Sequence, residues 1–205
     1  MINQLKQWDE QLLLFLNQFH VSWLDPVMYL VTKTEFWIPL YVFLIYLIFR
    51  NYKKEGWLVL AGVVITVLLA DQITVSLMKP FFQRLRPSHE PSLEGLLHVV
   101  NDYRGGLYGF ASSHAANTAG VAFFVFLLFR KTYHWIWLIF IWTFVMTYTR
   151  IYLGVHYPGD ILAGGLVGLL SGYAGFRFYV WLRSRVRLSP TNMPDGRKGK
   201  GEFNP

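Results

Sequence analysis

Three permanently positive side chains, Lys79, Arg86 and Arg150, lie beside long apolar stretches of the chain. Lys79 and Arg86 belong to the segment "KPFFQRLRP", and Arg150 begins the segment "RIYLGVHYPGD". An arginine side chain offers a planar pair of N–H donors that fits two phosphate oxygens, and a lysine adds a compact charge. These residue types together suit a phosphate dianion, so the first chemistry that they indicate is the binding of a phosphoryl group.

A second segment, "ASSH", stands immediately before an apolar run and contains Ser112, Ser113 and His114. Serine is a favoured residue at the start of a helix, where free backbone N–H groups and the helix dipole attract an anion. The two serines either cap a helix and do no more, or help its open end to hold phosphate oxygens. An imidazole beside them can protonate a departing oxygen, and we expect this role for His114.

A third segment places His156 one helical turn before Asp160, with Pro158 at a position that suits the start of a helix. A carboxylate at this spacing can accept the Nδ1–H of the imidazole and leave Nε2 free to attack phosphorus. The neighbouring cations can stabilise the transferred group, so we expect neither a metal nor a cofactor. Each segment alone also has an ordinary explanation as a surface cation cluster, a helix cap or a turn.

Apolar runs around these segments must position them, and each is a candidate membrane helix. A membrane span needs about 20 residues. The runs predict an all-α membrane bundle with five to six transmembrane helices, and they cover residues 36–49, 57–78, 115–129, 135–153 and 160–182.

The two ends of the chain differ from this pattern. Residues 5–32 carry apolar side chains at helical spacing but are interrupted by charges, which predicts an amphipathic interfacial helix followed by a partial or full span. Residues 189–205 are polar and rich in glycine and proline, which predicts a disordered tail. Residues 1–188 are expected to form a single membrane domain.

Loop charges predict an orientation in the membrane. Basic clusters after the first, third and fifth runs fall on one side, which the positive-inside rule makes cytoplasmic. The opposite loops still contain Arg84, Arg104 and the three cations of the motifs. Cations that break the rule are expected to have a local role.

Composition supports the same class. Apolar residues make up 54% of the 205-residue chain, and charged residues only 15%. The net charge of +7 is spread over loops between apolar runs, which favours a membrane protein over one that binds nucleic acid. No cysteine is present, so disulfides and thiolate metal sites are excluded, and no cleavable signal peptide is apparent.

The three segments together resemble the type 2 phosphatidic acid phosphatase family, which shares its site with vanadium haloperoxidases and bacterial acid phosphatases. That family carries K-x6-R-P, P-S-G-H and S-R-x5-H-x3-D in this order. The first motif matches fully here. Ala111 and Ser113 replace Pro and Gly in the second motif, and Thr149 replaces Ser in the third.

The resemblance implies a phosphatase that works through a phosphohistidine. His156 would be the nucleophile, Asp160 would orient it, and His114 would serve the leaving group. The resemblance also implies which residues bind phosphate, namely Lys79, Arg86, Ser112, Ser113 and Arg150.

The favoured hypothesis is a multi-pass lipid phosphatase of the bacterial inner membrane, with its site on the outer, periplasmic face and undecaprenyl pyrophosphate as substrate. Phosphatidylglycerol phosphate, phosphatidic acid and lipid A 1-phosphate remain alternatives, as does phosphate transfer between lipids. An intramembrane serine protease or a small transporter are the hypotheses from other classes. The oligomeric state is left open.

Overall fold

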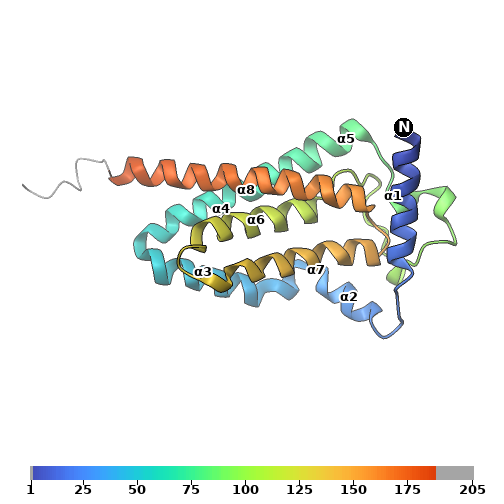
Figure 1. The fold of residues 1–205 in the computed structure, drawn as a ribbon, viewed down its shortest axis with the longest axis horizontal. Helices are drawn as coiled ribbons and strands as arrows, with labels where there is room; N and C mark the ends of the chain where they lie inside the picture. Colours follow the sequence, from blue (N-terminus) through green and yellow to red (C-terminus); the bar gives the residue numbers. More distant parts are fainter. Residues whose placement is uncertain (1, 188–205) are drawn as a thin grey trace, which may run out of the picture.

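Five helices lie side by side along the long axis of the molecule (Figure 1). The computed structural model describes residues 2–187, so the tail expected to be disordered, 189–205, lies outside the described residues. Each helix coincides with one of the five apolar runs, which confirms the all-helical prediction. They are α3 (Ile38–Tyr52), α4 (Gly56–Asp71), α6 (Ser113–Phe129), α7 (Ile139–Tyr152) and α8 (Pro158–Arg187).

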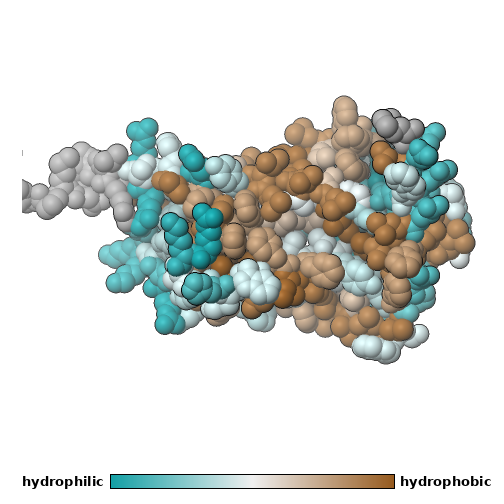
Figure 2. All heavy atoms as spheres, in the orientation of Figure 1, coloured by the Kyte–Doolittle hydropathy of each residue, from teal (hydrophilic) through white to brown (hydrophobic). Residues whose placement is uncertain are grey.

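Length and hydropathy make this bundle suitable for a membrane. Within residues 2–187, three helical stretches are long and apolar enough to cross one: Thr34–Phe82, His134–Tyr152 and Pro158–Val186. The first stretch contains both α3 and α4. The chain turns back between them at the 3₁₀ segment Lys53–Glu55, so this stretch forms two antiparallel helices. Figure 2 shows apolar side chains along the middle of the visible face and hydrophilic ones gathered towards its two ends.

A seam of small residues joins α6 to α8. Glycines recur on one face of α8 at Gly164, Gly168 and Gly172, and a Cβ at any of them would collide with backbone atoms of α6. Such close packing of backbones is typical of membrane helices that associate through small residues. The atoms that each Cβ would meet are the carbonyl oxygens of Ser112, Ala116 and Gly120 respectively. The seam therefore holds the start of α6 directly against the first turns of α8.

Larger side chains fill the space on the other side of α6. Phe124 and Val125 of α6 are buried with Trp142 of α7 and Leu44 of α3, and Val59 of α4 joins the same cluster. Apolar packing of this kind fixes the relative positions of α3, α4, α6 and α7.

The helix that begins with α4 changes its geometry before it reaches the first motif. Residues Gln72–Met78 form a π-helical stretch, and α5 (Lys79–Phe82) follows without a break. The left-handed backbone of Gln83, with φ of 46°, then ends the helix. π-Helical turns are uncommon and occur frequently at functional sites, and this one sets the direction from which Lys79 enters its site.

The N-terminal segment forms two helices of unlike character. Helix α1 (Ile2–Asn17) lies across one end of the bundle (Figure 1), as expected of an amphipathic segment. Helix α2 (Asp25–Val31) has seven residues and so covers only about 10 Å, a third of the hydrocarbon core. The alternative of a full sixth crossing in residues 5–32 is therefore wrong. Pro26 in the first turn of α2 and the turn before this helix limit its length.

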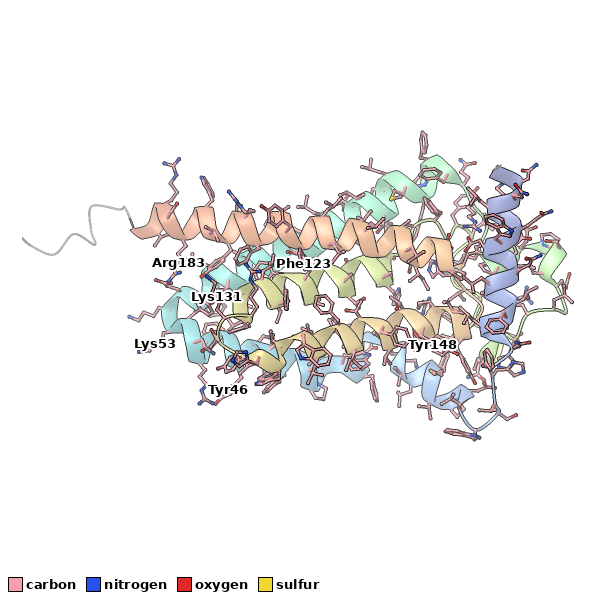
Figure 3. All side chains as sticks on the ribbon, in the orientation of Figure 1. Tyr46, Lys53, Phe123, Lys131, Tyr148 and Arg183 are labelled. Atoms are coloured by element: carbon pink, nitrogen blue, oxygen red, sulfur yellow. The ribbon has the colours of Figure 1, made fainter. Side chains whose placement is uncertain are left out.

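The basic loop clusters all lie at one end of the bundle. Lys53, Lys131 and Arg183 gather there in Figure 3, far from α1. An ion pair of 2.7 Å between Arg183 Nε and Glu55 Oε2 joins α8 to the turn between α3 and α4. Helix α1 and the beginnings of α6 and α8 occupy the opposite end (Figure 1).

Candidate active site

The structure brings the three motifs together at the end of the bundle that α1 crosses. Lys79 Nζ lies 3.3 Å from Ser113 Oγ, which joins the first motif to the second. The Ser112 N–H donates to the Asp160 carbonyl at 3.0 Å and joins the second to the third. These links depend on the seam between α6 and α8, since that seam places the two helix starts side by side.

His156 and Asp160 form the pair that the sequence predicts. His156 Nδ1 lies 3.3 Å from Asp160 Oδ2, and both side chains are completely buried. The same carboxylate oxygen accepts the Tyr157 N–H at 3.1 Å. His156 Nε2 has no hydrogen-bond partner, so the nitrogen opposite the carboxylate is free for a reaction.

The surroundings of His156 keep its imidazole neutral. Burial lowers the pKa of His156 well below 6.5, and the positive charges of Arg86, Arg150 and Lys79 lower it further. A neutral imidazole is the form that can act as a nucleophile.

Among the described residues, the cations of the three motifs have no direct ion-pair partner, although the nearby Asp160 carboxylate offsets part of their charge. Arg86 and Arg150 are buried, yet no ion pair joins Lys79, Arg86 or Arg150 to a carboxylate within residues 2–187. Burial, followed by the charge of Arg150, lowers the pKa of Arg86 to about 10. Buried charges without partners are costly, and a bound phosphate dianion would supply the missing negative charge.

Each arginine is held by neutral oxygen atoms. Arg86 Nε donates to the Tyr108 carbonyl at 3.3 Å, and its Nη1 to the Val155 carbonyl at 3.5 Å. Arg150 Nη1 donates to Thr32 Oγ1 at 2.7 Å, and its Nη2 to the Tyr103 hydroxyl at 3.2 Å. These contacts fix both guanidinium groups, while Arg150 Nε keeps an unused donor.

The start of α6 has the cap that its sequence predicts. Ser112 is the N-cap residue, and its Oγ accepts the Ala115 N–H at 3.4 Å. Ser113, which replaces the glycine of the family motif, directs its hydroxyl to Lys79. The substitution therefore adds a contact between two of the motifs.

His114 lies where two cavities meet. A small cavity of 190 Å³, called the polar cavity after the residue types around it, is lined by His114, Arg150, Tyr103 and Lys33. A larger apolar cavity of 490 Å³ runs between α3, α4, α6 and α7, and Ser113 and His114 also line it. A molecule with a polar head and an apolar tail can thus place its junction beside this imidazole.

Four residues in contact with the site were not assigned to it from the sequence. Thr32 and Tyr103 hold Arg150, and they lie in segments without a motif. Arg84 and Asp9 form ion pairs that lead to Asp160. Of these four residues, only Arg84 stood out in the sequence, as an unexpected cation in an outer loop.

The arrangement can transfer a phosphoryl group without a metal. It offers a neutral imidazole, a carboxylate that orients it, a second imidazole and unpaired cations. Residues 2–187 contain no group of three or more His, Cys, Asp or Glu side chains that could hold a metal ion. Fixed cations can stabilise the charge of the transferred group in the place of a metal.

A helical membrane bundle with this site belongs to a class of phosphatases that act on membrane lipids. The family model of the PAP2 superfamily matches residues 56–184. The chain belongs to the PAP2 superfamily and is a metal-independent lipid phosphatase of the membrane. The resemblance noted in the sequence is therefore confirmed.

Relatives with assigned activities cover most of the chain. A lipid A 4'-phosphatase of Bacteroides thetaiotaomicron is 38% identical over 98% of this chain and 88% of its own length. One of Porphyromonas gingivalis is also 38% identical, over 86% of this chain and 75% of its own. An undecaprenyl-diphosphatase of Sulfolobus acidocaldarius is 28% identical over 77% of this chain and 72% of its own.

A solved structure shares the fold. The PAP2-type phosphatidylglycerolphosphate phosphatase of Bacillus subtilis aligns with a TM-score of 0.61 at 24% identity, over 91% of this chain and 90% of its own. This likeness concerns the arrangement of helices and supports a multi-pass membrane protein of this type.

Proposed function

We propose that the protein removes a phosphate from lipid A, and that this phosphate is the one at the 4' position. The observation that carries the proposal is the near-full-length similarity to two lipid A 4'-phosphatases. The undecaprenyl pyrophosphate favoured from the sequence has the weaker support of a more distant relative. Lipid A was an alternative there, with the phosphate at position 1.

His156 attacks phosphorus through Nε2, and the bond between phosphorus and the lipid oxygen breaks. His114 gives a proton to that oxygen as it leaves. A bound phosphate brings negative charge beside His114, which favours the imidazolium that this step requires. Water then attacks the phosphohistidine, His114 takes a proton from the water, and inorganic phosphate is released.

Cations and backbone hold the phosphoryl group throughout. Lys79, Arg86 and Arg150 supply positive charge to it, and the N–H groups of Ser113 and His114 at the start of α6 add donors. Asp160 keeps the proton of His156 on Nδ1 and stabilises the positive charge that develops on the ring.

The two cavities at His114 suit the two parts of such a lipid. The polar cavity accepts part of the head group on the leaving-group side, and the apolar cavity accepts an acyl chain between the helices. A tail inside the bilayer and a phosphate at its edge avoid burying an unpaired charge in hydrocarbon.

A panel of pure lipids tests the substrate. Purified protein is given lipid A with only the 4'-phosphate, lipid A with only the 1-phosphate, and undecaprenyl pyrophosphate, and the released phosphate is measured. We expect the highest kcat/KM for the first lipid, with mass spectrometry showing loss of one phosphate. A higher kcat/KM for undecaprenyl pyrophosphate would return the assignment to the carrier lipid.

We also propose five crossings of the inner membrane, with the site on the periplasmic side. The basic end that contains Lys131 is then cytoplasmic. Since the chain has no cysteine, Ser92→Cys and Lys131→Cys can each be labelled alone. A membrane-impermeant maleimide should label the first in intact spheroplasts and the second only after lysis, and the reverse pattern would overturn this orientation.

A further inference from the structure

A chain of charged contacts runs from the N-terminal helix to the proposed nucleophile. Asp9 Oδ2 of α1 lies 2.8 Å from Arg84 Nη2, and Arg84 Nη1 lies 3.1 Å from Asp160 Oδ1. Asp160 then contacts His156 through its other oxygen. One guanidinium group thus connects a surface helix with the carboxylate that orients the reactive imidazole.

Arg84 is the fixed centre of this chain. Its guanidinium carbon lies 3.8 Å from the centre of the Tyr157 ring, so the group is stacked as well as paired. Only this arginine forms an ion pair with Asp160 Oδ1 in the described part of the chain. Without Arg84, a fully buried carboxylate oxygen would lose its partner, which is costly and frees the carboxylate to turn.

Asp9 holds the other side of Arg84 and also the start of α8. Its Oδ1 accepts the N–H of Gly159 at 2.7 Å, and Gly159 is the residue just before Asp160. The two helices meet closely here, because a Cβ at Gly159 would lie 2.7 Å from Asp9 Oδ2. Helix α1 therefore contacts the backbone beside Asp160 directly, through Gly159, and the side chain of Asp160 indirectly, through Arg84.

Helix α1 has independent contacts that keep it docked. Asn17 Nδ2 donates to the carbonyls of Ile151 and Tyr152 at the end of α7, at 3.1 and 2.9 Å. Leu13 is completely buried beneath the helix. The opposite face of the helix is apolar and exposed, as suits a helix in the membrane interface, and it comprises Leu5, Trp8, Leu12 and Phe15.

We propose that Arg84 and Asp9 are positioning residues, through which the docked helix α1 holds Asp160 and His156 in their reactive geometry. The proposal rests on the role assigned to His156 under the proposed function. Asp9 lies outside the three motifs, and Arg84 occupies an unspecified position inside the first. In the described part of the chain, no hydrogen bond or ion pair joins either residue to Lys79, Arg86 or Arg150.

Steady-state kinetics with p-nitrophenyl phosphate test the proposal without reference to the identity of the lipid. Arg84→Gln should lower kcat by roughly 10-fold to 100-fold, the range known for removal of the group that orients a metal-bound histidine. KM should stay unchanged, because Arg84 does not contact the phosphate. Arg84→Lys keeps the charge but lacks the planar fork, so its kcat should lie between those of Arg84→Gln and the wild type.

Asp9→Asn keeps an oxygen for the Gly159 N–H and removes the charge that holds Arg84. We expect a smaller loss of kcat than for Arg84→Gln. The double variant of Asp9→Asn and Arg84→Gln should lose no more than Arg84→Gln alone, because both act through the same contact. Gly159→Ala, which displaces the Asp9 carboxylate without a change of charge, should resemble Asp9→Asn.

Glu10→Gln is the matched control, since it removes a negative charge from the adjacent position of α1, and it should keep the wild-type kcat. Wild-type kcat in both Arg84→Gln and Asp9→Asn, a loss confined to KM, or losses that multiply in the double variant would each overturn the proposal. Should Arg84→Gln fail to fold in detergent, Arg84→Lys, Asp9→Asn and Gly159→Ala decide the question. Full activity of His156→Ala would instead overturn the proposed mechanism itself.

Discussion

Both ends of the bundle are rich in basic residues, but the two groups of cations have opposite surroundings. At the end that contains Lys53 and Lys131, these two side chains are exposed (Figure 3). At the other end, Arg86 and Arg150 are buried and bind neutral oxygens. Exposed charges cost little and favour one orientation in the membrane, whereas buried unpaired charges require a ligand of opposite sign.

The difference shows that two kinds of basic residue are distinguished by their hydrogen bonds more than by their residue type. One kind orients the protein in the membrane, and the other kind binds a ligand. Arg130 and Arg150 have the same side chain and lie at opposite ends of the bundle. Arg130 is exposed, whereas Arg150 is held by hydrogen bonds to Thr32 and Tyr103, and its Nε has no partner and is free to bind a substrate. Substitutions at the two ends can therefore test the contrast directly.

The largest expected effect comes from a comparison of two histidines, His114 at the buried end and His134 at the basic end. His114→Ala should lower kcat for a lipid phosphate by about 10²-fold to 10⁴-fold, the typical contribution of a general acid. The loss should be much smaller for p-nitrophenyl phosphate, whose oxygen leaves readily without a proton. His134→Ala, at the exposed basic end, is the control with normal kinetics. Equal losses of His114→Ala on both substrates would contradict the role given to His114.

The paired arginines give the next effect. Arg150→Gln should reduce kcat/KM by about 10²-fold to 10³-fold, the range for removal of one donor to a developing negative charge. Arg130→Gln should leave kcat/KM unchanged, since its side chain is exposed at the far end. Vanadate inhibition should weaken in the first variant alone. Similar kinetics of the two variants would remove the distinction between the two ends.

The sequence predicted the five long helices, and it singled out the motif residues that the structure brings together. Apolar runs are local signals, and the motif spacing places Arg150, His156 and Asp160 around one helix junction. Contacts between distant segments could not be predicted in this way. Thr32 binds Arg150 across 118 positions, and Asp9 binds Gly159 across 150, because tertiary packing alone brings these residues together.

The buried end should also respond to pH through His156. Its pKa is lowered well below 6.5 in the folded protein by burial and by Arg86, Arg150 and Lys79, whereas the unfolded chain has the ordinary value of about 6.5. Below that pH the unfolded state binds the extra proton, so the free energy of unfolding falls as the pH falls. The slope from this one group approaches about 1.4 kcal/mol per pH unit.

Thermal unfolding in detergent measures this slope. Between about pH 7.5 and about pH 5, the Tm of the wild type should fall more steeply than that of His156→Ala, which lacks the titrating group. Parallel curves for wild type and His156→Ala would show that His156 is not held neutral.

The smallest expected effect belongs to the ion pair at the basic end. Arg183 and Glu55 are about one-third exposed, with side-chain accessibilities of 35% and 33%. A pair in contact with solvent contributes roughly 0.2–1 kcal/mol, because water and salt screen the attraction. Arg183→Gln should therefore lower the Tm only slightly, leave kcat unchanged, and show no difference from wild type in high salt.

The ion pair of Arg84 with Asp160 has a similar distance but a fully buried carboxylate, so its loss should appear in kcat and persist in high salt. A large loss of kcat in Arg183→Gln would show that the basic end communicates with the site, and the contrast between the two ends would then fail.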